Sequence, residues 1–449
     1  MEKQIKLAVM AHIDGAWVGC GVLTHTEEGN QTIGSSFAYG SRYIKRPNAL
    51  EVDPTTAAFA NLPHAGNKML FPSVGLPFIG GIRDAAPDAW GRRVIEAKLK
   101  VAPDSLPESQ YLLHAGSDRV GALDIRASLT SPPINGAQGV NSLAYLMDAA
   151  QRIDEGEDVP AHLTPIFAAG SGLGGARPKA TVRDECGILY MAKFSRKGEK
   201  LNMPWLEMAT LRLAQKTGSV VPQVEVRRIG ERDVMLIQRF DRYWTAQGAA
   251  ALSAGQETLD AKVAHKGYVE KRLGFVSGLT LMQCHEMDSP SKSYADLALA
   301  IQKYGHPGTV AADKRELFCR MVFNIFVTNN DDHLRNHGMV FDPKLRGWRL
   351  SPLYDVTPGN DRSSERVLHL SVGPQGKLAT LDNALAGCAS FGLSPQGAQI
   401  VMSQVWEKVR EWQVYFQEWG VPAEQVQAAA GAFRHVRDVA SPALQAQLH

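Results

Sequence analysis

The chain has 449 residues, of which 44% are hydrophobic and 21% are charged, and its formal net charge at pH 7 is +2. These values are typical of a globular protein with two or three domains and a large core, and they exclude a general polyanion-binding protein. The five cysteines are scattered without C-x-x-C spacing, so neither a disulfide framework nor a zinc site is expected. No signal peptide or membrane-spanning segment is expected, and a cytoplasmic location is predicted.

Residues 1–130 are predicted to be β-rich with turns, as in the strand pattern at 17–23, with one helix near residues 88–98. The sequence SPPING at 131–136 predicts a boundary. Residues 131–250 are expected to form a mixed α/β nucleotide lobe. The small-residue segment that starts at 247 connects it to a largely helical portion, so the predicted domains are 1–130, 131–250 and 251–449.

A glycine-rich segment, GSGLGG at 170–175, continues as ARPK to residue 179. Glycines let backbone N–H groups approach phosphate oxygens, and Lys179 adds positive charge at the end of the loop. Pro178 and a strand-like run at 180–183 follow it. A dinucleotide-binding loop would be followed by a helix, and a Walker A loop would close with Gly-Lys-Ser/Thr, so both are disfavoured.

The next elements carry a lysine and a glutamate. The predicted strand at 187–194 contains Lys193, at the place where kinases pair a lysine with the α/β-phosphates. The alternative is an edge-strand lysine that faces solvent. A predicted amphipathic helix at about 204–216 contains Glu207, which would orient that lysine or would simply be solvated. Residues 233–242 are predicted to form a strand that runs into a polar hinge, whose backbone would bind an adenine ring.

Helical periodicity marks residues 294–304, 312–327, 394–416 and 423–439. The sequence NDDHLRN at 330–336 follows the apolar run MVFNIFV at 321–327. Asp331 and Asn336 have the spacing of a kinase catalytic loop, in which Asp takes the hydroxyl proton and Asn holds magnesium. Asp355 lies on a short apolar segment at 348–356, where a kinase places its main metal-binding Asp. The alternative is a set of turn and cap residues. The serial order of all these signals favours phosphoryl transfer.

The segments that carry these signals are GGARPK at 174–179, QRFDR at 238–242, NDDHLRN at 330–336 and LYD at 353–355. Together with DAAPDAWG at 84–91 and AGSDRVGAL at 115–123, they resemble the HipA-like serine/threonine kinases, the toxins of bacterial type II toxin–antitoxin pairs. The resemblance covers about residues 15–440. It implies an α+β, bilobal protein-kinase-like fold, with a mixed α/β N-terminal lobe, an extra N-terminal β-rich subdomain and a mainly helical C-terminal lobe.

The resemblance also implies roles for individual residues. Asp331 would be the catalytic base, and Asn336 and Asp355 would be the magnesium ligands. The implied ATP-binding residues are Gly174, Gly175, Ala176, Arg177, Pro178, Lys179, Lys193, Gln238, Arg239, Phe240, His333, Asn336, Tyr354 and Asp355. The family's autophosphorylated serine lies three positions before the second glycine of the Gly-Gly pair. Gly172 occupies that position here, and Ser171, one residue earlier, is the candidate.

By resemblance, the cofactors are ATP and Mg²⁺, and the protein substrate is an aminoacyl-tRNA synthetase or another translation component. The implied partner is a helix-turn-helix antitoxin of the HipB type and, through it, operator DNA; no membrane is involved. Two other classes stay open: a small-molecule phosphotransferase of the aminoglycoside or lipid-kinase kind, and a non-catalytic, kinase-like co-repressor module.

Overall fold

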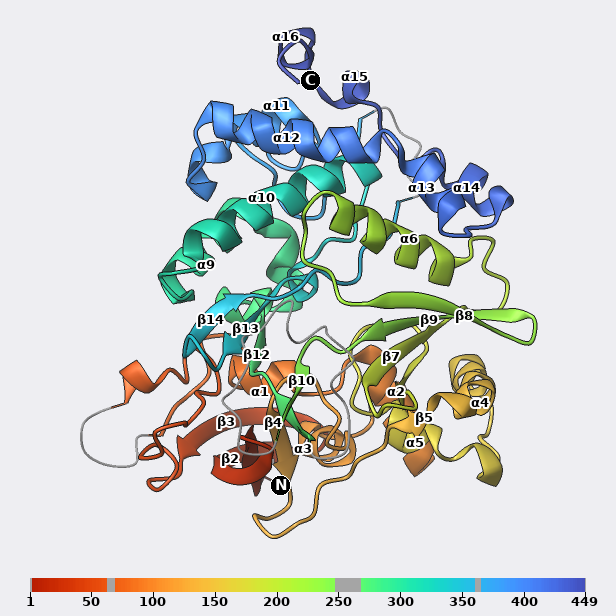
Figure 1. Ribbon diagram of the computed structural model, residues 1–449. Coiled ribbons are helices and arrows are strands. Elements are labelled where there is room, and N and C mark those ends of the chain that lie inside the picture. Colours follow the sequence, from red (N-terminus) through yellow and green to blue (C-terminus); the bar gives the residue numbers. More distant parts are fainter. Residues whose placement is uncertain (1, 63–68, 247–267, 360–364, 449) are drawn as a thin grey trace. The chain divides into compact units, whose positions relative to one another are not determined.

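The computed structural model describes residues 2–62, 69–246, 268–359 and 365–448 (Figure 1). The chain divides into two compact units. Unit 1 comprises Met1–Gly198, Arg227–Val276 and Val340–Arg346, and unit 2 comprises Glu199–Val226, Ser277–Met339 and Gly347–His449. The predicted boundary at 131–136 therefore lies inside unit 1, and the predicted connection that starts at 247 lies outside the described residues.

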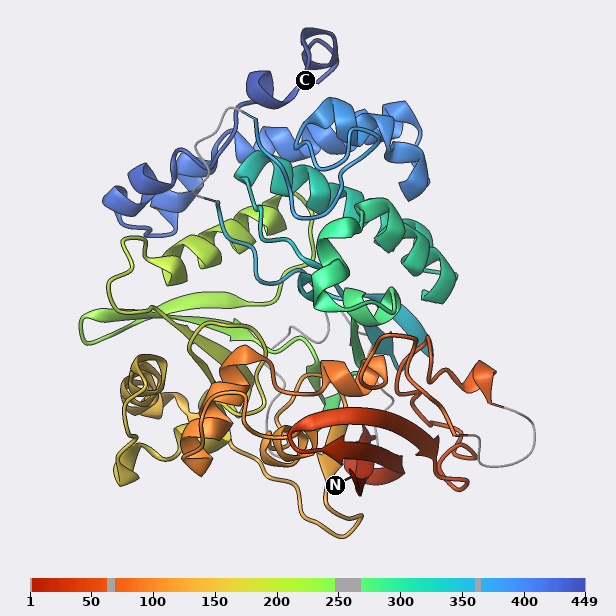
Figure 2. The same cartoon turned by 180° about the vertical axis from the view of Figure 1, so that it is seen from behind.

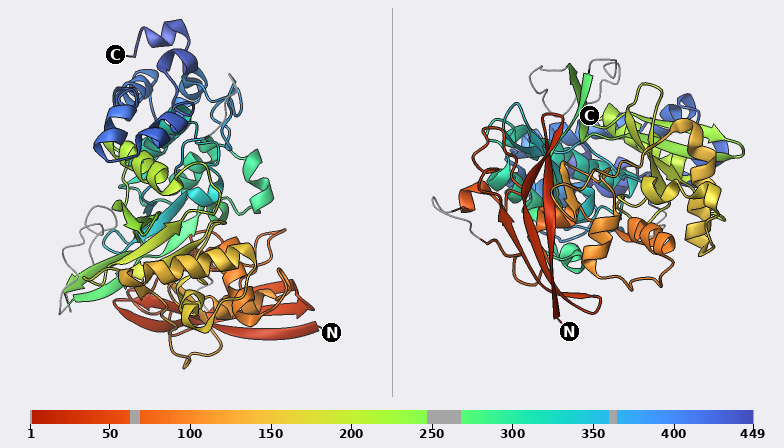
Figure 3. Two further views of the ribbon diagram at one scale, coloured as in Figure 1. Left: turned by 90° about the vertical axis from the view of Figure 1, so that its right-hand side faces the viewer. Right: turned by 90° about the horizontal axis from the view of Figure 1, so that it is seen from below.

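Unit 1 begins with an antiparallel sheet of order β3-β2-β1-β4. Its strands are β1 (Glu2–Ile13), β2 (Ala16–Glu28), β3 (Gln31–Tyr39) and β4 (Leu123–Arg126). The long strands β1 and β2 run side by side in Figure 3. The turn between them places Asp14 and Gly15 at positive φ, as a tight hairpin requires. Alternate residues such as Leu7, Val9 and Ala11 enter the core, so the predicted β-rich region is confirmed.

Three helices follow in unit 1: α1 (Gly80–Asp84), α2 (Ala89–Leu99) and α3 (Glu108–His114). Helix α2 begins after Asp88, whose carboxylate accepts a hydrogen bond from the Ala89 N–H, and it ends where Lys100 turns left-handed. The helix predicted near residues 88–98 thus forms within one residue of its expected ends.

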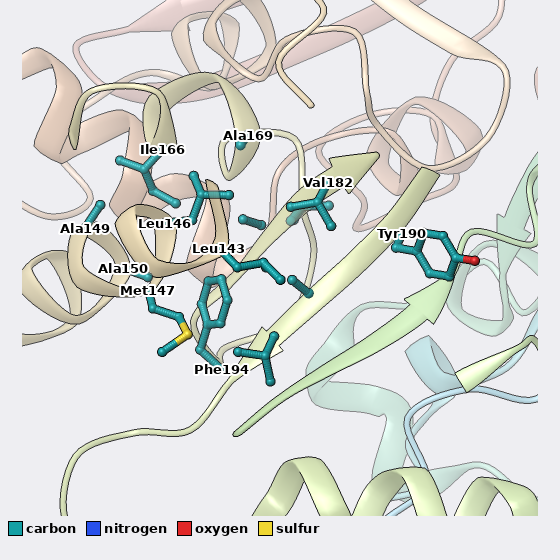
Figure 4. Packing of buried hydrophobic residues seen from close by; sticks show 14 of the residues in the cluster. Leu143, Leu146, Met147, Ala149, Ala150, Ile166, Ala169, Val182, Tyr190 and Phe194 are labelled. Atoms are coloured by element: carbon teal, nitrogen blue, oxygen red, sulfur yellow. The ribbon is translucent and has the colours of Figure 1, made fainter. Parts of the chain in front are cut away.

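A second sheet has the order β5-β6-β7-β9-β8. The strands are β5 (Gln138–Gly139), β6 (Lys179–Arg183), β7 (Leu189–Phe194), β8 (Val224–Ile229), in which the chain returns to unit 1, and β9 (Arg232–Gln238). Helices α4 (Leu143–Glu155) and α5 (Ile166–Ala169) pack against it, and Figure 4 shows Leu146, Met147 and Ile166 meeting Val182 and Phe194. Unit 1 also contains the antiparallel pair of β10 (Arg242–Ala246) and β11 (Tyr268–Arg272).

Unit 2 is mainly helical. Its helices are α6 (Met203–Lys216), α8 (Gly278–Leu281), α9 (Tyr294–Tyr304), α10 (Val310–Val327), α11 (Leu381–Ala386), α12 (Pro395–Val409), α13 (Trp412–Glu418), α14 (Ala423–Ala429), α15 (Val436–Val439) and α16 (Pro442–Gln445). Helix α12 lies along α10 (Figures 1 and 2). A small sheet of order β12-β13-β14 has residues assigned to both units; its strands are β12 (Phe275–Ser277), β13 (Gly338–Asp342) and β14 (Gly347–Leu350). No helix in the described parts of the chain is long and apolar enough to cross a membrane.

Two predicted helices are each divided in two. The segment expected at 394–416 breaks after Val409, and helix α13 turns Trp412 onto Phe433, with ring centroids 3.9 Å apart and nearly parallel planes. The segment expected at 423–439 breaks because its middle bonds to the end of α10. The Arg434 N–H donates to the Phe326 carbonyl (2.7 Å). In both places tertiary contacts outweigh helix propensity.

Candidate functional site

The predicted site residues are divided between the two units. Unit 1 holds Ser171, Gly174, Gly175, Ala176, Arg177, Pro178, Lys179, Lys193, Gln238, Arg239 and Phe240. Unit 2 holds Glu207, Asp331, His333, Asn336, Tyr354 and Asp355.

The polar loop at 330–336 is held by the element before it and by its own backbone. Helix α10 is buried along its second half and stops at Thr328, whose φ of 54° is left-handed. Within the loop, the His333 N–H donates to the Asp331 carbonyl (2.9 Å) and the Asn336 N–H donates to the His333 carbonyl (2.9 Å). The Asn336 side-chain amide donates to the Asp331 carbonyl at 3.0 Å. The two residues of the predicted D-x-x-x-x-N pair are therefore directly connected.

Asp332, next to the predicted base, is the buried anchor of this loop. Its carboxylate is 1% exposed and accepts hydrogen bonds from Asn324 Nδ2 (2.7 Å), His337 Nε2 (2.9 Å) and the Tyr294 hydroxyl. Burial raises the pKa of Asp332, but His337 and these hydrogen bonds outweigh burial, and the net pKa is lowered. Asp331, by contrast, is exposed. Of the two neighbouring acids, only Asp331 presents its side chain to solvent.

Sequence reasoning missed the partners of Asp332. Tyr294, Asn324 and His337 were not predicted as site residues, although Asn324 was visible as the one polar residue in the run at 321–327. An amide in the middle of a buried helix must find a partner, and Asn324 also accepts a hydrogen bond from Asn329 Nδ2 (3.1 Å). This polar residue within an apolar run was the sequence signal that could have indicated a buried polar contact.

A second contact that was not predicted joins His333 to His369. The His333 and His369 rings meet edge to face, with centroids 5.9 Å apart. His369 Nε2 is 2.9 Å from the Ser289 hydroxyl oxygen, which accepts a hydrogen bond from the Leu334 N–H (3.1 Å). Burial first, and then His333 and Lys377, lower the pKa of His369. The imidazole is therefore favoured in its neutral form next to the loop.

The remaining predicted residues of unit 2 lie on separate segments. The Tyr354 hydroxyl donates to the Arg335 carbonyl (2.8 Å), so the 353–355 segment is attached to the loop at 330–336. Asp355 has a φ of 59°, which non-glycine residues rarely adopt, and such positions are concentrated at functional sites. Glu207 lies on α6 and is 4% exposed, so the alternative of a solvated helical glutamate is wrong.

In unit 1, Lys193 lies on β7 between β6 and β9, and its residue is 9% exposed. The alternative of an edge-strand lysine that faces solvent is therefore wrong. Lys179 is its register partner on β6, so the two predicted phosphate lysines are directly opposite each other across the ladder. Lys179 Nζ also donates to the Gly174 carbonyl at 2.7 Å. Gly175 has a φ of 78°, which explains the need for glycine there.

The hinge residues have different environments. The Arg239 guanidinium is buried and donates to the Asp241 carboxylate (2.6 Å) and to the carbonyls of Asp118 and Arg119. Its backbone N–H donates to the Leu189 carbonyl (2.9 Å). The ring of Phe240 contacts Phe275, with centroids 6.0 Å apart. The side chain of Arg239 thus has a structural role, which the sequence did not predict.

Ser171 is 1% exposed, and its hydroxyl is buried without a hydrogen-bond partner within the described chain. Its carbonyl oxygen is only 2.6 Å from the position that a Cβ on Gly91 of α2 would occupy. Phosphorylation of Ser171 therefore requires the loop to leave this position.

Magnesium chemistry fits the predicted donors. In the described parts of the chain, no group of three or more His, Cys, Asp or Glu is placed to hold a metal. The predicted ligands are instead one amide and one carboxylate, which suit magnesium when phosphate oxygens and water complete the shell. Because the Asn336 N–H₂ group faces the Asp331 carbonyl, its amide oxygen is the atom left to act as a ligand.

The mixed α/β fold, with a glycine loop and a strand lysine in one unit and a D-x-x-x-x-N loop in the other, defines a protein of the kinase-like class. Residues 171–413 match the family described as HipA-like C-terminal domain. That match covers more than half of the chain, so the chain belongs to this family, and the resemblance inferred from sequence is confirmed.

The chain is also similar to individual proteins. The protein named "Putative kinase Y4mE" of Sinorhizobium fredii is 24% identical over 353 residues, covering 76% of this chain and 75% of that protein. HipA of Shewanella oneidensis, solved with HipB and its operator DNA, aligns with a TM-score of 0.63 and 14% identity, covering 98% of this chain and 95% of HipA. The Helicobacter pylori kinase CtkA gives a TM-score of 0.37 and 13% identity, over 58% of this chain and 90% of CtkA. The match to HipA confirms the predicted fold class.

Proposed function

We propose that this chain is an ATP-dependent serine/threonine protein kinase that acts as a growth-inhibiting toxin. Its substrate is a protein, an aminoacyl-tRNA synthetase or another translation component. Its partner is a helix-turn-helix antitoxin that connects it to operator DNA. Family membership and the solved HipA–HipB–operator complex of a relative support this proposal.

One observation carries the enzymatic part of the proposal. Asp331 is exposed, whereas Asp332 is buried and its carboxylate accepts three hydrogen bonds. The Asn336 side-chain amide donates to the Asp331 carbonyl, which fixes its orientation. A catalytic base must reach a substrate hydroxyl, and a metal ligand must be oriented in advance. This arrangement supports Asp331 as the base and Asn336 as the ligand.

In this mechanism, the oxygen of the substrate hydroxyl attacks the γ-phosphorus of ATP, and its proton passes to the Asp331 carboxylate. The bond from that phosphorus to the β–γ bridging oxygen breaks, and ADP leaves. Magnesium, when bound, neutralises charge on the phosphate oxygens. Asn336 and Asp355 would hold it, and Lys193, the Gly174–Gly175 turn and Lys179 would bind the phosphates. Glu207 is the acid proposed to orient Lys193.

The Asp331→Asn variant tests the proposal. Its rate of transfer from γ-labelled ATP to protein should fall by about 10²–10⁴-fold, since the proton acceptor is lost, and growth inhibition should disappear. Glu418→Gln is the matched control, because it neutralises an exposed acid elsewhere in unit 2 and should leave the rate unchanged. Full transfer by Asp331→Asn would refute the assignment. Label that enters a small molecule instead of protein would indicate a small-molecule phosphotransferase, and no transfer by the unsubstituted protein would indicate a non-catalytic module.

A further inference from the structure

The glycine loop is supported by the start of α2, a segment outside the family match at 171–413. One carboxylate oxygen of Asp88 caps α2 at the Ala89 N–H (2.8 Å), and the other accepts the Gly175 N–H at 3.0 Å. The Trp90 N–H donates to the Gly175 carbonyl at 2.9 Å. Both backbone polar groups of Gly175 are therefore bound by the first residues of α2.

The next residues of the loop are held in the same way. Arg93 of α2 donates to the Ala176 carbonyl through Nη2 (2.5 Å) and to Asp154 through Nη1 (2.6 Å). Arg196, just after β7, donates to the same carbonyl at 2.8 Å. The fully buried indole of Trp90 donates to the Lys179 carbonyl at 2.7 Å. The loop is thus attached at Gly175, Ala176 and Lys179.

A loop rich in glycine has the largest conformational freedom to lose when it binds a ligand. Contacts that fix its conformation before the ligand arrives remove part of that entropic penalty, which strengthens binding without touching the ligand. The Gly175 φ of 78° is one such fixed conformation, and Asp88 and Arg93 are placed to maintain it.

Resting on the proposed function, we propose that Asp88 and Arg93 are positioning residues that hold the glycine loop in its phosphate-binding conformation. The segment before the family domain therefore sets the affinity for ATP. Asp88 and Arg93 act through the loop backbone and do not take part in phosphoryl transfer, so their loss should change KM for ATP and leave kcat nearly unchanged.

The test compares three substitutions on the same helix. Asp88→Ser keeps a good helix cap but cannot also reach Gly175. Arg93→Ala removes one of the two donors to the Ala176 carbonyl and leaves Arg196 as the other. Arg92→Ala is the matched control, since Arg92 pairs with Glu108 (2.6 Å) and not with the loop. Hydrogen–deuterium exchange of peptides spanning 170–179, without nucleotide, reports loop order directly, and steady-state kinetics report KM and kcat.

We expect Asp88→Ser and Arg93→Ala to exchange faster than the unsubstituted protein in this loop and to raise KM for ATP about tenfold, the size of one lost charge-assisted hydrogen bond. Arg92→Ala should change neither quantity. A lower KM in Asp88→Ser would overturn the proposal, because these contacts would then compete with nucleotide. Unchanged loop exchange would also overturn it. If the unsubstituted protein does not bind ATP but loop exchange still rises in the variants, the proposed function fails while the structural support of the loop stands.

Discussion

At the scale of single residues, Asp331 and Asp332 are chemically identical neighbours in opposite surroundings. The same change should therefore affect different properties. Asp332→Asn breaks a buried cluster and should lower the free energy of unfolding by about 3 kcal/mol or more. Asp331→Asn, at an exposed site, should change it by less than about 0.5 kcal/mol while abolishing activity. Urea denaturation of both variants measures this, and equal stabilities would contradict the buried-anchor assignment.

The Asp332 cluster also predicts a pH dependence. The pKa of Asp332 in the folded state lies below its ordinary value of 3.8, so folding favours the charged form of this carboxylate. Its contribution to stability is present above pH 3.8 and is lost as the pH falls through the lower folded-state pKa. The stability difference between the unsubstituted protein and Asp332→Asn, measured by urea midpoints at decreasing pH, should therefore shrink in acid. A constant difference would contradict this account.

Residue chemistry could be predicted from sequence only where spacing carries it. The Asp331–Asn336 interval and the single lysine in the strand at 187–194 indicate a candidate site. The anchoring role of Asp332 could not be predicted, because burial depends on Tyr294 and His337, which reach it through tertiary packing. The structural use of the Arg239 guanidinium was hidden for the same reason, since Asp118 and Arg119 lie more than 100 residues away in sequence.

At the scale of elements, α9 connects a helix cap to the candidate site. Ser293 and Asp296 form a capping box at its start, and Tyr294, the first helical residue, donates to Asp332. Ser293→Ala should cost about 1 kcal/mol of stability. Ser291→Ala, which removes an exposed hydroxyl just before the helix, should change stability by less than about 0.5 kcal/mol. Chemical denaturation measures both, and equal effects would argue against the cap.

Helical periodicity predicted the ends of a helix well where burial of one helix face determines its position. The helix at 294–304 has the predicted ends, and the one expected at 312–327 begins two residues earlier at Val310. The expected helices at 394–416 and 423–439 failed as single elements because Trp412 stacks on Phe433 and Arg434 bonds to the end of α10. Local periodicity contains no information about such partners.

At the scale of the whole molecule, the first 130 residues contribute to the core beneath the glycine loop. Trp90 and Val94 of α2 pack in one cluster with Leu146, Val182 and Leu236. A fragment of residues 131–449 lacks α2 but retains every residue of unit 2. We therefore expect strands β6, β7 and β9 to lose protection from hydrogen exchange in this fragment, while α9, α10 and α12 keep theirs.

Addition of residues 1–130 in trans is the control for this fragment, because it restores the missing side chains without changing the rest. Recovery of protection in β6, β7 and β9 would support the shared core. Full protection of these strands in the fragment alone would show that residues 131–250 fold without α2.

The order in which the chain visits its two units has a consequence for synthesis. Unit 1 includes Val340–Arg346, where Val340 packs with Tyr243 and Leu273, and where the Phe341 N–H donates to the Gly274 carbonyl at 2.9 Å. A nascent chain cannot complete unit 1 until these residues have left the ribosome. Tyr243 and Leu273, which pack against this segment, must therefore wait with apolar surface exposed while Ser277–Met339 of unit 2 is being made. Until then, these exposed apolar side chains should make the nascent chain more prone to aggregation than the finished protein.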